Sequence, residues 1–382
     1  MRIFIIARGY PSKQEPTWGC FEKDQAEALA SLGHNVTILS VDMRFRFYWR
    51  ALGCRHIIKN GISIYNIFLL PYALLFFLPK FVKNSFYAWQ LDVLYQRAIF
   101  QQGTPDILYS HYLHTTQKAI RIHKKYNIPL VGIEHWSQMA FQPISKNNLS
   151  IAREVYSSID QLITVSSSLR KNILTQIGID SIVIPNIVGN EFYYSSKQIN
   201  RKTTKIVTVG RLAPEKRFDL LLKALSKIDL PWELNIIGAG KILTELELLT
   251  NSLQLTQRVH FLGMKSKIEI VEILQNSHFF VLPSLSETFG VVYIEALACG
   301  LPVVSTDCGG PRDIVTPQNG LLIPCENEVA LEHALLHMLQ HYTQYDRKSI
   351  AEDCQARFSP KVIAEQLTQI FENTIKKVKN SQ

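Results

Sequence analysis

The sequence lacks the cysteine patterns of disulfide-rich and zinc-binding proteins. Its six cysteines include no C-x-x-C pair, and no histidine lies at metal-ligand spacing from two of them. Disulfide frameworks and structural zinc sites depend on such spacings. The start of the chain also shows no signal-peptide architecture. We therefore expect reduced thiols and a cytoplasmic protein.

Internal repeats and nucleic-acid-binding modules are also missing. No segment recurs at the period of a solenoid or a propeller. The net charge of +9 favours anionic partners, but the chain carries no recognisable module that reads nucleic acid. We therefore expect anionic lipids or phosphorylated small molecules as partners, and no nucleic acid.

Acidic residues are absent from Met43 to Leu91, and the part from Met43 to Lys83 holds seven lysines and arginines. Within it, Tyr65–Val82 is strongly apolar but contains Pro71 and Pro79. A membrane-spanning helix needs about 20 apolar residues, so we expect no span. Two interpretations stay open: an interfacial segment that holds the protein on the inner face of a membrane, and a buried strand followed by a core helix.

Short apolar runs alternate with helical patterns, which predicts parallel sheets covered on both faces. A polar stretch at 186–203 separates two such series, so we expect two doubly wound domains, at 1–195 and 204–358. Ligands of these sheets bind beyond the carboxyl ends of the strands. The predicted strands are 2–7, 35–41, 106–110, 129–134, 161–166, 182–185, 205–210, 233–238, 259–262, 278–283 and 302–306. A periodic helix is predicted at 360–379.

The most informative segment is Pro283–Gly310, PSLSETFGVVYIEALACGLPVVSTDCGG. A strand is predicted to end at Pro283 and a helix to begin near Gly290, where free backbone N–H groups and the helix dipole can hold an anion. Glu287 precedes this helix, and Glu295 lies on its second turn. Carboxylates on either side of a bound phosphate can accept hydrogen bonds from hydroxyls. The pattern suits a ligand built of sugar, diphosphate and ribose.

Glu287 and Glu295, in the setting S-E-T-F-G-V-V-Y-I-E-A-L-A-C-G-L-P-V-V, resemble the E-x7-E motif of retaining glycosyltransferases of family 4, which have the GT-B fold. The resemblance implies that Glu287 contacts the donor sugar and that Glu295 binds the ribose. It also implies that the backbone of Phe289, Gly290 and Val291 holds the sugar and the diphosphate.

A second segment, Val209–Arg217 (VGRLAPEKR), supports this resemblance. A strand is predicted to end at Gly210, which we count among the donor-binding residues. Arg211 and Lys216 follow it and resemble the family's pair of basic residues on the diphosphate. Positive charge at this place offsets the charge that develops on the leaving nucleotide.

Weaker matches add five positions. In the second domain, Gly238 lies in a turn near the expected nucleotide, and Gly263 with Met264 resembles the family's base-binding turn. In the first domain, His135 ends a predicted strand, where the family's histidine contacts the donor sugar near the reacting carbon. Gly19 lies in a loop that resembles the family's loop near the acceptor.

The resemblance covers nearly the whole chain and implies two Rossmann-like domains that face each other across a cleft, with the helix at 360–382 packed back on the first domain. The implied reaction transfers a hexosyl group from a nucleoside diphosphate sugar to a hydroxyl of a glycan or lipid-linked acceptor, with retention of configuration and without a cofactor or an obligatory metal. Cell-envelope or extracellular polysaccharide synthesis is the expected setting. Two alternatives stay open: a nucleotide-sugar 2-epimerase of the same fold, and a non-catalytic nucleotide-sugar-binding subunit of a polysaccharide assembly complex.

Overall fold

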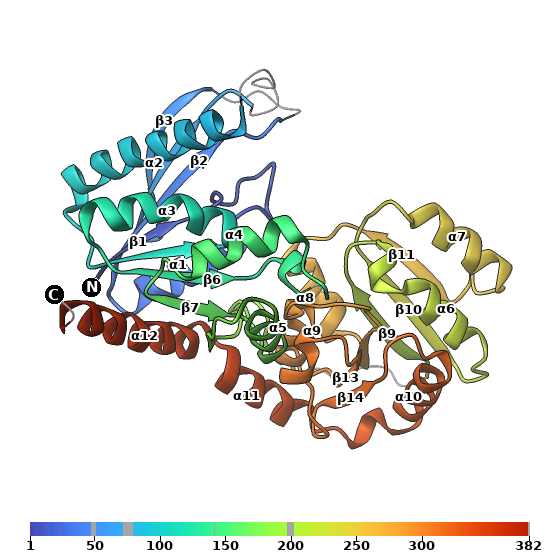
Figure 1. Ribbon diagram of the computed structural model, residues 1–382. Coiled ribbons are helices and arrows are strands. Elements are labelled where there is room, and N and C mark those ends of the chain that lie inside the picture. Colours follow the sequence, from blue (N-terminus) through green and yellow to red (C-terminus); the bar gives the residue numbers. More distant parts are fainter. Residues whose placement is uncertain (47–50, 72–78, 141, 197–201, 381–382) are drawn as a thin grey trace. The chain divides into compact units, whose positions relative to one another are not determined.

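The computed structural model describes residues 1–46, 51–71, 79–140, 142–196 and 202–380. The chain forms two compact units (Figure 1). Unit 1 comprises Met1–Val165, Leu169–Ile187 and Pro360–Gln382, and unit 2 comprises Ser166–Ser168 and Val188–Ser359. Both units are built on parallel sheets with helical crossovers, which confirms the predicted fold class.

The sheet of unit 1 has the strand order β3-β4-β2-β1-β5-β6-β7-β8. Its strands are β1 (Arg2–Ile6), β2 (Asn35–Asp42), β3 (Gly53–Lys59), β4 (Ile62–Phe68), β5 (Ile107–His111), β6 (Leu130–Glu134), β7 (Gln161–Thr164) and β8 (Ile182–Val183). The central strands are continuous runs of aliphatic residues and are buried over almost their whole length, as is typical of parallel strands covered on both faces. The strand order reverses between β1 and β5, which defines the switch point of this sheet.

The edge of this sheet is an antiparallel hairpin of β3 and β4, which the sequence periodicity did not predict. Asn60 and Gly61 form its two-residue turn, with φ of 50° and 75°. Two successive positive φ angles are the signature of a type I′ turn, for which Asn-Gly is the preferred pair. Residues 65–68 of the apolar segment Tyr65–Val82 are therefore strand, whereas residues 72–78 lie outside the described part of the chain.

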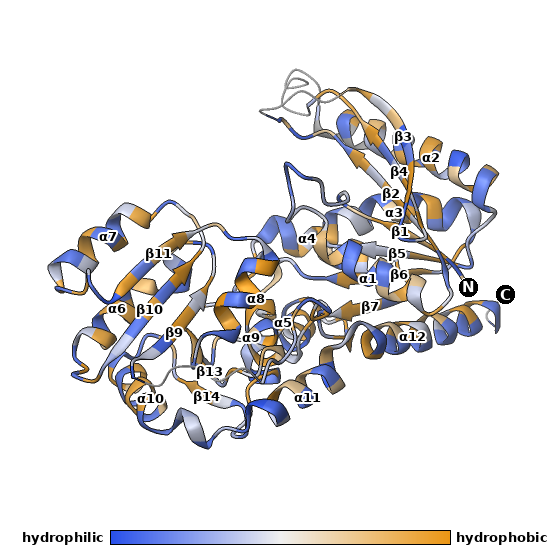
Figure 2. Cartoon of the chain, turned by 180° about the vertical axis from the view of Figure 1, so that it is seen from behind, coloured by the Kyte–Doolittle hydropathy of each residue, from blue (hydrophilic) through white to orange (hydrophobic). Residues whose placement is uncertain are grey.

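Helices cover both faces of the first sheet (Figure 1). They are α1 (Cys20–Ser31), α2 (Lys80–Gln102), α3 (Leu113–Tyr126), α4 (Lys146–Tyr156), α5 (Ser167–Ile177) and α12 (Pro360–Asn380). Helix α12 packs beside α1 and places the Phe371 ring 5.0 Å from that of Tyr109. Figure 2 shows both hydrophobic and hydrophilic residues along α12, because only one face of the helix is buried. No helix within the described residues is long and apolar enough to cross a bilayer.

The sheet of unit 2 has the order β11-β10-β9-β12-β13-β14, with every pair of neighbours parallel. Its strands are β9 (Thr204–Val209), β10 (Trp232–Ile237), β11 (Val259–Gly263), β12 (Phe279–Leu282), β13 (Val303–Thr306) and β14 (Gly320–Ile323). Its helices are α6 (Phe218–Ser226), α7 (Leu243–Ser252), α8 (Lys267–Gln275), α9 (Val291–Ala298), α10 (Glu328–His341) and α11 (Arg347–Phe358). If these strands are numbered 1 to 6 along the chain, their order across the sheet is 3-2-1-4-5-6, the pattern of dinucleotide-binding sheets. The switch point therefore lies between β9 and β12.

Candidate active site

Glu287 lies in the loop between β12 and α9, at the switch point of the second sheet. An isolated parallel bridge fixes this loop to the segment after β13. In it, the Glu287 N–H donates to the Cys308 carbonyl at 3.2 Å, and the Gly310 N–H donates to the Glu287 carbonyl at 2.9 Å. A side chain at position 310 would place its Cβ 2.3 Å from the backbone of Phe289. Glycine is therefore required for the bridge that positions the glutamate.

The Glu287 carboxylate meets the predicted diphosphate-binding lysine. Its Oε1 accepts hydrogen bonds from Lys216 Nζ at 2.5 Å and from Ser284 Oγ at 2.9 Å. Both charged side chains are largely buried, with exposed fractions of 18% for Lys216 and 11% for Glu287. The structure does not bring Arg211 into this cluster, because its guanidinium pairs with Glu215 and its side chain is 72% exposed.

Helix α9 begins directly after this loop, at Val291, with Gly290 as its N-cap. Gly290 has φ of 96°, and a Cβ there would lie 2.6 Å from the Tyr293 ring. No side chain of the described residues caps the start of the helix, so the N–H groups around Val291 suit an anion. Phe289 is buried against Phe358, and Glu295 is half-buried on the second turn.

Three glycines predicted to bind the donor, Gly210, Gly238 and Gly263, lie together at the carboxyl ends of neighbouring strands in the second sheet. The Gly210 N–H donates to the Ile237 carbonyl at 3.0 Å, and the Gly238 N–H donates to the Gly263 carbonyl at 2.9 Å. A Cβ on Gly238 would lie 1.9 Å from the Gly210 carbonyl oxygen. Met264 follows on the same edge and is 67% exposed. The close approach of the backbone at this place therefore requires glycine at position 238.

In unit 1, His135 follows β6 and is buried within a row of rings. Its imidazole stacks on Phe21, with ring centroids 5.2 Å apart, and on His111, at 5.3 Å. Burial lowers the pKa of His135 well below its usual value and that of His111 to about 3, so both rings are neutral at pH 7. The ring nitrogens of His111 have no hydrogen-bond partner among the described residues, whereas the Asn186 side chain contacts His135 and opposes the lowering of its pKa.

Glu134 positions this histidine, a role that the sequence reasoning missed. Its buried carboxylate accepts hydrogen bonds from the backbone N–H groups of Leu113, His135 and Trp136, at 2.7–2.8 Å, and from the Tyr156 hydroxyl at 2.7 Å. Burial raises the pKa of Glu134, and the four donors oppose that shift. The carboxylate thus ties the end of β6 to the start of α3. An acid at the end of an otherwise apolar strand was the only signal in the sequence.

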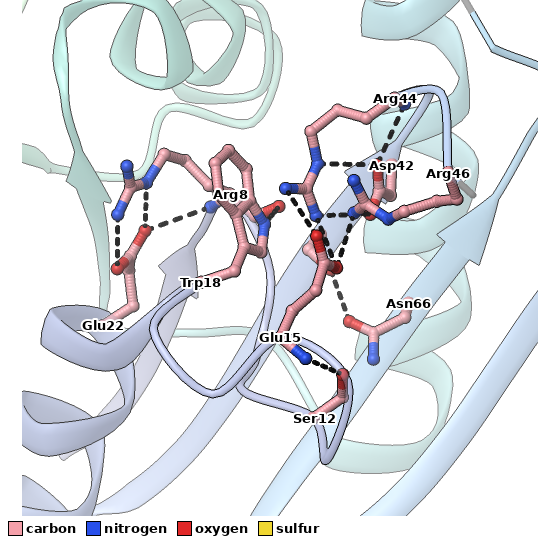
Figure 3. A network of polar contacts seen from close by, with 10 residues as sticks. Arg8, Ser12, Glu15, Trp18, Glu22, Asp42, Arg44, Arg46 and Asn66 are labelled. Carbon is pink, nitrogen blue, oxygen red and sulfur yellow. Dashed lines mark hydrogen bonds and ion pairs between the residues drawn. The ribbon is translucent and has the colours of Figure 1, made fainter. Parts of the chain in front are cut away.

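The loop before α1 is fixed by Gly19, which has φ of 78° and whose Cβ would lie 2.3 Å from the Gly9 carbonyl oxygen. Beside it, Arg8 forms an ion pair with the buried Glu22 at 2.9 Å, and its guanidinium lies over the Tyr112 ring at 3.6 Å. Figure 3 shows this pair from close by.

A second cluster in Figure 3 changes the interpretation of the basic stretch Met43–Lys83. Arg44 and Arg46 converge on two acids, Asp42 and Glu15, at 2.5–3.4 Å. Both arginines are therefore neutralised within unit 1. Together with Arg50 they were predicted to contribute to an anionic-surface contact, and Arg50 lies outside the described residues.

Two doubly wound α/β units form the GT-B fold, which solved glycosyltransferases share. Sucrose-phosphate synthase from Thermosynechococcus elongatus has the same fold, with a TM-score of 0.78 over 98% of this chain and 99% of that chain at 20% identity. The Anabaena HepE protein, solved in complex with UDP-glucose, matches with a TM-score of 0.72 over 97% and 99% of the two chains at 18% identity.

Family models identify the chain more closely. The Glycosyltransferase Family 4 model matches residues 23–192, and the Glycosyl transferases group 1 model matches residues 190–353. The putative teichuronic acid biosynthesis glycosyltransferase TuaC of Bacillus subtilis is 27% identical over 377 residues, which span 92% of this chain and 90% of that protein. The chain belongs to this family of glycosyltransferases.

Proposed function

We propose that this glycosyltransferase moves a hexosyl group from a UDP-sugar to a hydroxyl of a glycan or lipid-linked acceptor, with retention at the anomeric carbon, during the synthesis of an envelope or extracellular polysaccharide. The observation that carries the proposal is the Lys216–Glu287 pair beside the start of α9. The HepE complex with UDP-glucose supports the choice of nucleotide, and the teichuronic acid relative supports the choice of pathway class.

Each group at the switch point of unit 2 has a role in donor binding under this proposal. The N–H groups at the start of α9 hold the diphosphate. Lys216 exchanges its bond with Glu287 for a phosphate oxygen, and Glu287 then accepts hydrogen bonds from hydroxyls of the donor sugar. The lysine and the helix start offset the charge that builds up on the leaving UDP, so we expect activity without a divalent metal.

We assign to His135 a hydrogen-bonding contact with the donor sugar near its reacting carbon. A neutral imidazole can donate one hydrogen bond and accept another. Because the Glu134 carboxylate holds the backbone of residues 135 and 136, the ring is preorganised for such a contact. Under this proposal the departing phosphate takes the acceptor proton, so no further base is required.

The experiment is an assay of UDP release with a panel of UDP-sugars, with and without acceptor glycans, combined with NMR of the product's anomeric carbon. Acceptor-dependent release with retained configuration supports the proposal. Release of UDP with a free, epimerised sugar and no acceptor identifies an epimerase instead. Absence of UDP binding by calorimetry contradicts the donor assignment and leaves a different nucleotide as the next test.

We also propose that unit 1 works at an anionic membrane surface. The hairpin strand β3 is exposed, and it carries Arg55 and Lys59 beside Ile57 and Ile58, which are 48% and 71% exposed. Basic and apolar side chains together favour an anionic bilayer. Co-sedimentation with phosphatidylglycerol vesicles, compared with phosphatidylcholine vesicles, should be lost in the Arg55→Gln/Lys59→Gln double variant. Equal sedimentation with both lipids contradicts this part of the proposal.

A further inference from the structure

Unit 1 contains a cavity of about 470 Å³ beyond the carboxyl ends of its strands. Its walls include Arg8, which follows β1, and Tyr112, which follows β5. The strand order reverses between these two strands, and such switch points are where doubly wound sheets bind ligands. The volume falls within the roughly 300–1,000 Å³ of small-molecule sites. The position and the size are those of a ligand site of unit 1.

Cations held on aromatic faces form much of the wall. The Arg8 guanidinium lies 3.6 Å from the centroid of the Tyr112 ring, and the Arg44 guanidinium lies 3.3 Å from that of Trp18. Arg8 is neutralised by Glu22, and Arg44 by Asp42 and Glu15. These arginines therefore shape the cavity without adding net charge to it.

Lys118 on α3, also in the wall of the cavity, differs from these arginines in its surroundings. Its ammonium lies 3.5 Å from the centroid of the Tyr87 ring, and no carboxylate among the described residues contributes to its pKa. Burial alone lowers its pKa to about 8. The Lys118 side chain is half-buried. A contact with an aromatic face attracts a cation but does not neutralise it, and a cation that is partly removed from water is stabilised by an anionic partner. The geometry leaves a place for an anion beside Lys118.

We propose that this cavity binds the acceptor as an anionic sugar, a hexuronate or a sugar phosphate, with Lys118 paired to the carboxylate or phosphate. Trp136, also in the wall, offers a large apolar surface to the sugar ring. The proposal rests on the proposed function, because it names the acceptor of that reaction. It makes Lys118 the residue that selects charged over neutral acceptors.

The test measures binding of three probes to protein saturated with UDP, so that unit 2 is occupied: methyl β-D-glucuronide, glucose 1-phosphate and the neutral methyl β-D-glucoside. Tryptophan fluorescence or ligand-observed NMR reports the affinity. We expect at least one charged probe to bind about tenfold or more tightly than the glucoside, because a charged hydrogen bond in a buried site contributes that much. The two charged probes distinguish a carboxylate acceptor from a phosphate acceptor.

Three variants test whether the preference for the charged probe depends on Lys118. Lys118→Met should remove the preference for the charged probe, and Lys118→Arg should retain most of it. Lys124→Met is the matched control, because it removes the same charge from an exposed position on the same helix; it should bind as the wild type does. Equal binding of all three probes by the wild type, or an undiminished preference in Lys118→Met, overturns the inference. UDP binding, measured separately, still stands in that case, so the failure is distinct from failure of the proposed function.

Discussion

Lys216 Nζ lies 2.5 Å from Glu287 Oε1, although the two residues are 71 positions apart in the chain. The lysine comes from the segment after β9 and the glutamate from the segment after β12, which are the two strands that flank the switch point. The pair therefore joins the two loops that the fold places at its ligand site. Without a ligand, each charge satisfies the other, which lowers the cost of burying both.

Replacing Glu287 by glutamine tests whether this carboxylate serves the reaction. Glu287→Gln keeps the size of the side chain but weakens its hydrogen bonds to sugar hydroxyls, so we expect turnover to fall about 100-fold. Affinity for UDP should change only a few-fold, because UDP lacks the hexosyl group that Glu287 is proposed to contact. Glu352→Gln, on the exposed surface of α11, is the control. Turnover like that of the wild type in Glu287→Gln would exclude the residue from the reaction.

The close backbone contact between Gly238 and Gly210 gives a prediction about stability. Gly238→Ala places a Cβ 1.9 Å from a carbonyl oxygen at φ of 141°, and should lower the free energy of unfolding of unit 2 by about 3 kcal/mol. Gly263→Ala also has a positive φ, of 67°, but its Cβ meets no atom within 4 Å. It should cost only about 1 kcal/mol. Urea unfolding compares them, and equal losses would contradict the backbone contact.

The strands of unit 2 show what a single sequence can reveal. Five of its six strands were predicted, because parallel strands buried on both faces are short, continuous apolar runs that turn residues interrupt. The hairpin strand β3 was missed because it is exposed at the sheet edge and has no apolar pattern. The pair Asn60-Gly61 is the local sequence signal for that hairpin.

The candidate site likewise contains some residues that local sequence motifs predict and others that they do not. Glu287, Gly290 and Lys216 were chosen from local motifs, and the structure brings them to one switch point. Glu134 and Lys118 could not be chosen in this way. Lys118 looks in the sequence like one of several basic residues on a helix, and its burial depends on contact with Tyr87 from α2. Such environments are made by tertiary packing, and no local pattern encodes them.

The buried His111 predicts how stability depends on pH. Its pKa is about 3 in the folded protein and about 6.5 in the unfolded chain. Between these values the unfolded state binds more protons, so stability falls as the pH falls from 6.5 towards 3. His111→Phe keeps a flat ring beside His135 and removes this contribution. Between pH 7.5 and 5, the wild type should lose up to about 2 kcal/mol more than the variant in urea unfolding; parallel losses would contradict a neutral, buried His111.

Lys118 predicts a pH dependence of stability in the alkaline range. Its pKa is lowered to about 8 in the folded protein and is near 10.4 in the unfolded chain. Between pH 8 and 10 the unfolded state therefore holds the extra proton, and the wild type should gain stability relative to Lys118→Met as the pH rises. At pH 7 the folded protein must bury an uncompensated charge, so Lys118→Met should unfold at a higher temperature than the wild type. Thermal unfolding of both proteins at pH 7, 8.5 and 10 measures the two effects. A lower unfolding temperature for the variant at pH 7 would mean that Lys118 contributes to the fold itself, whereas a higher one shows a lysine that costs stability until an anion occupies the cavity.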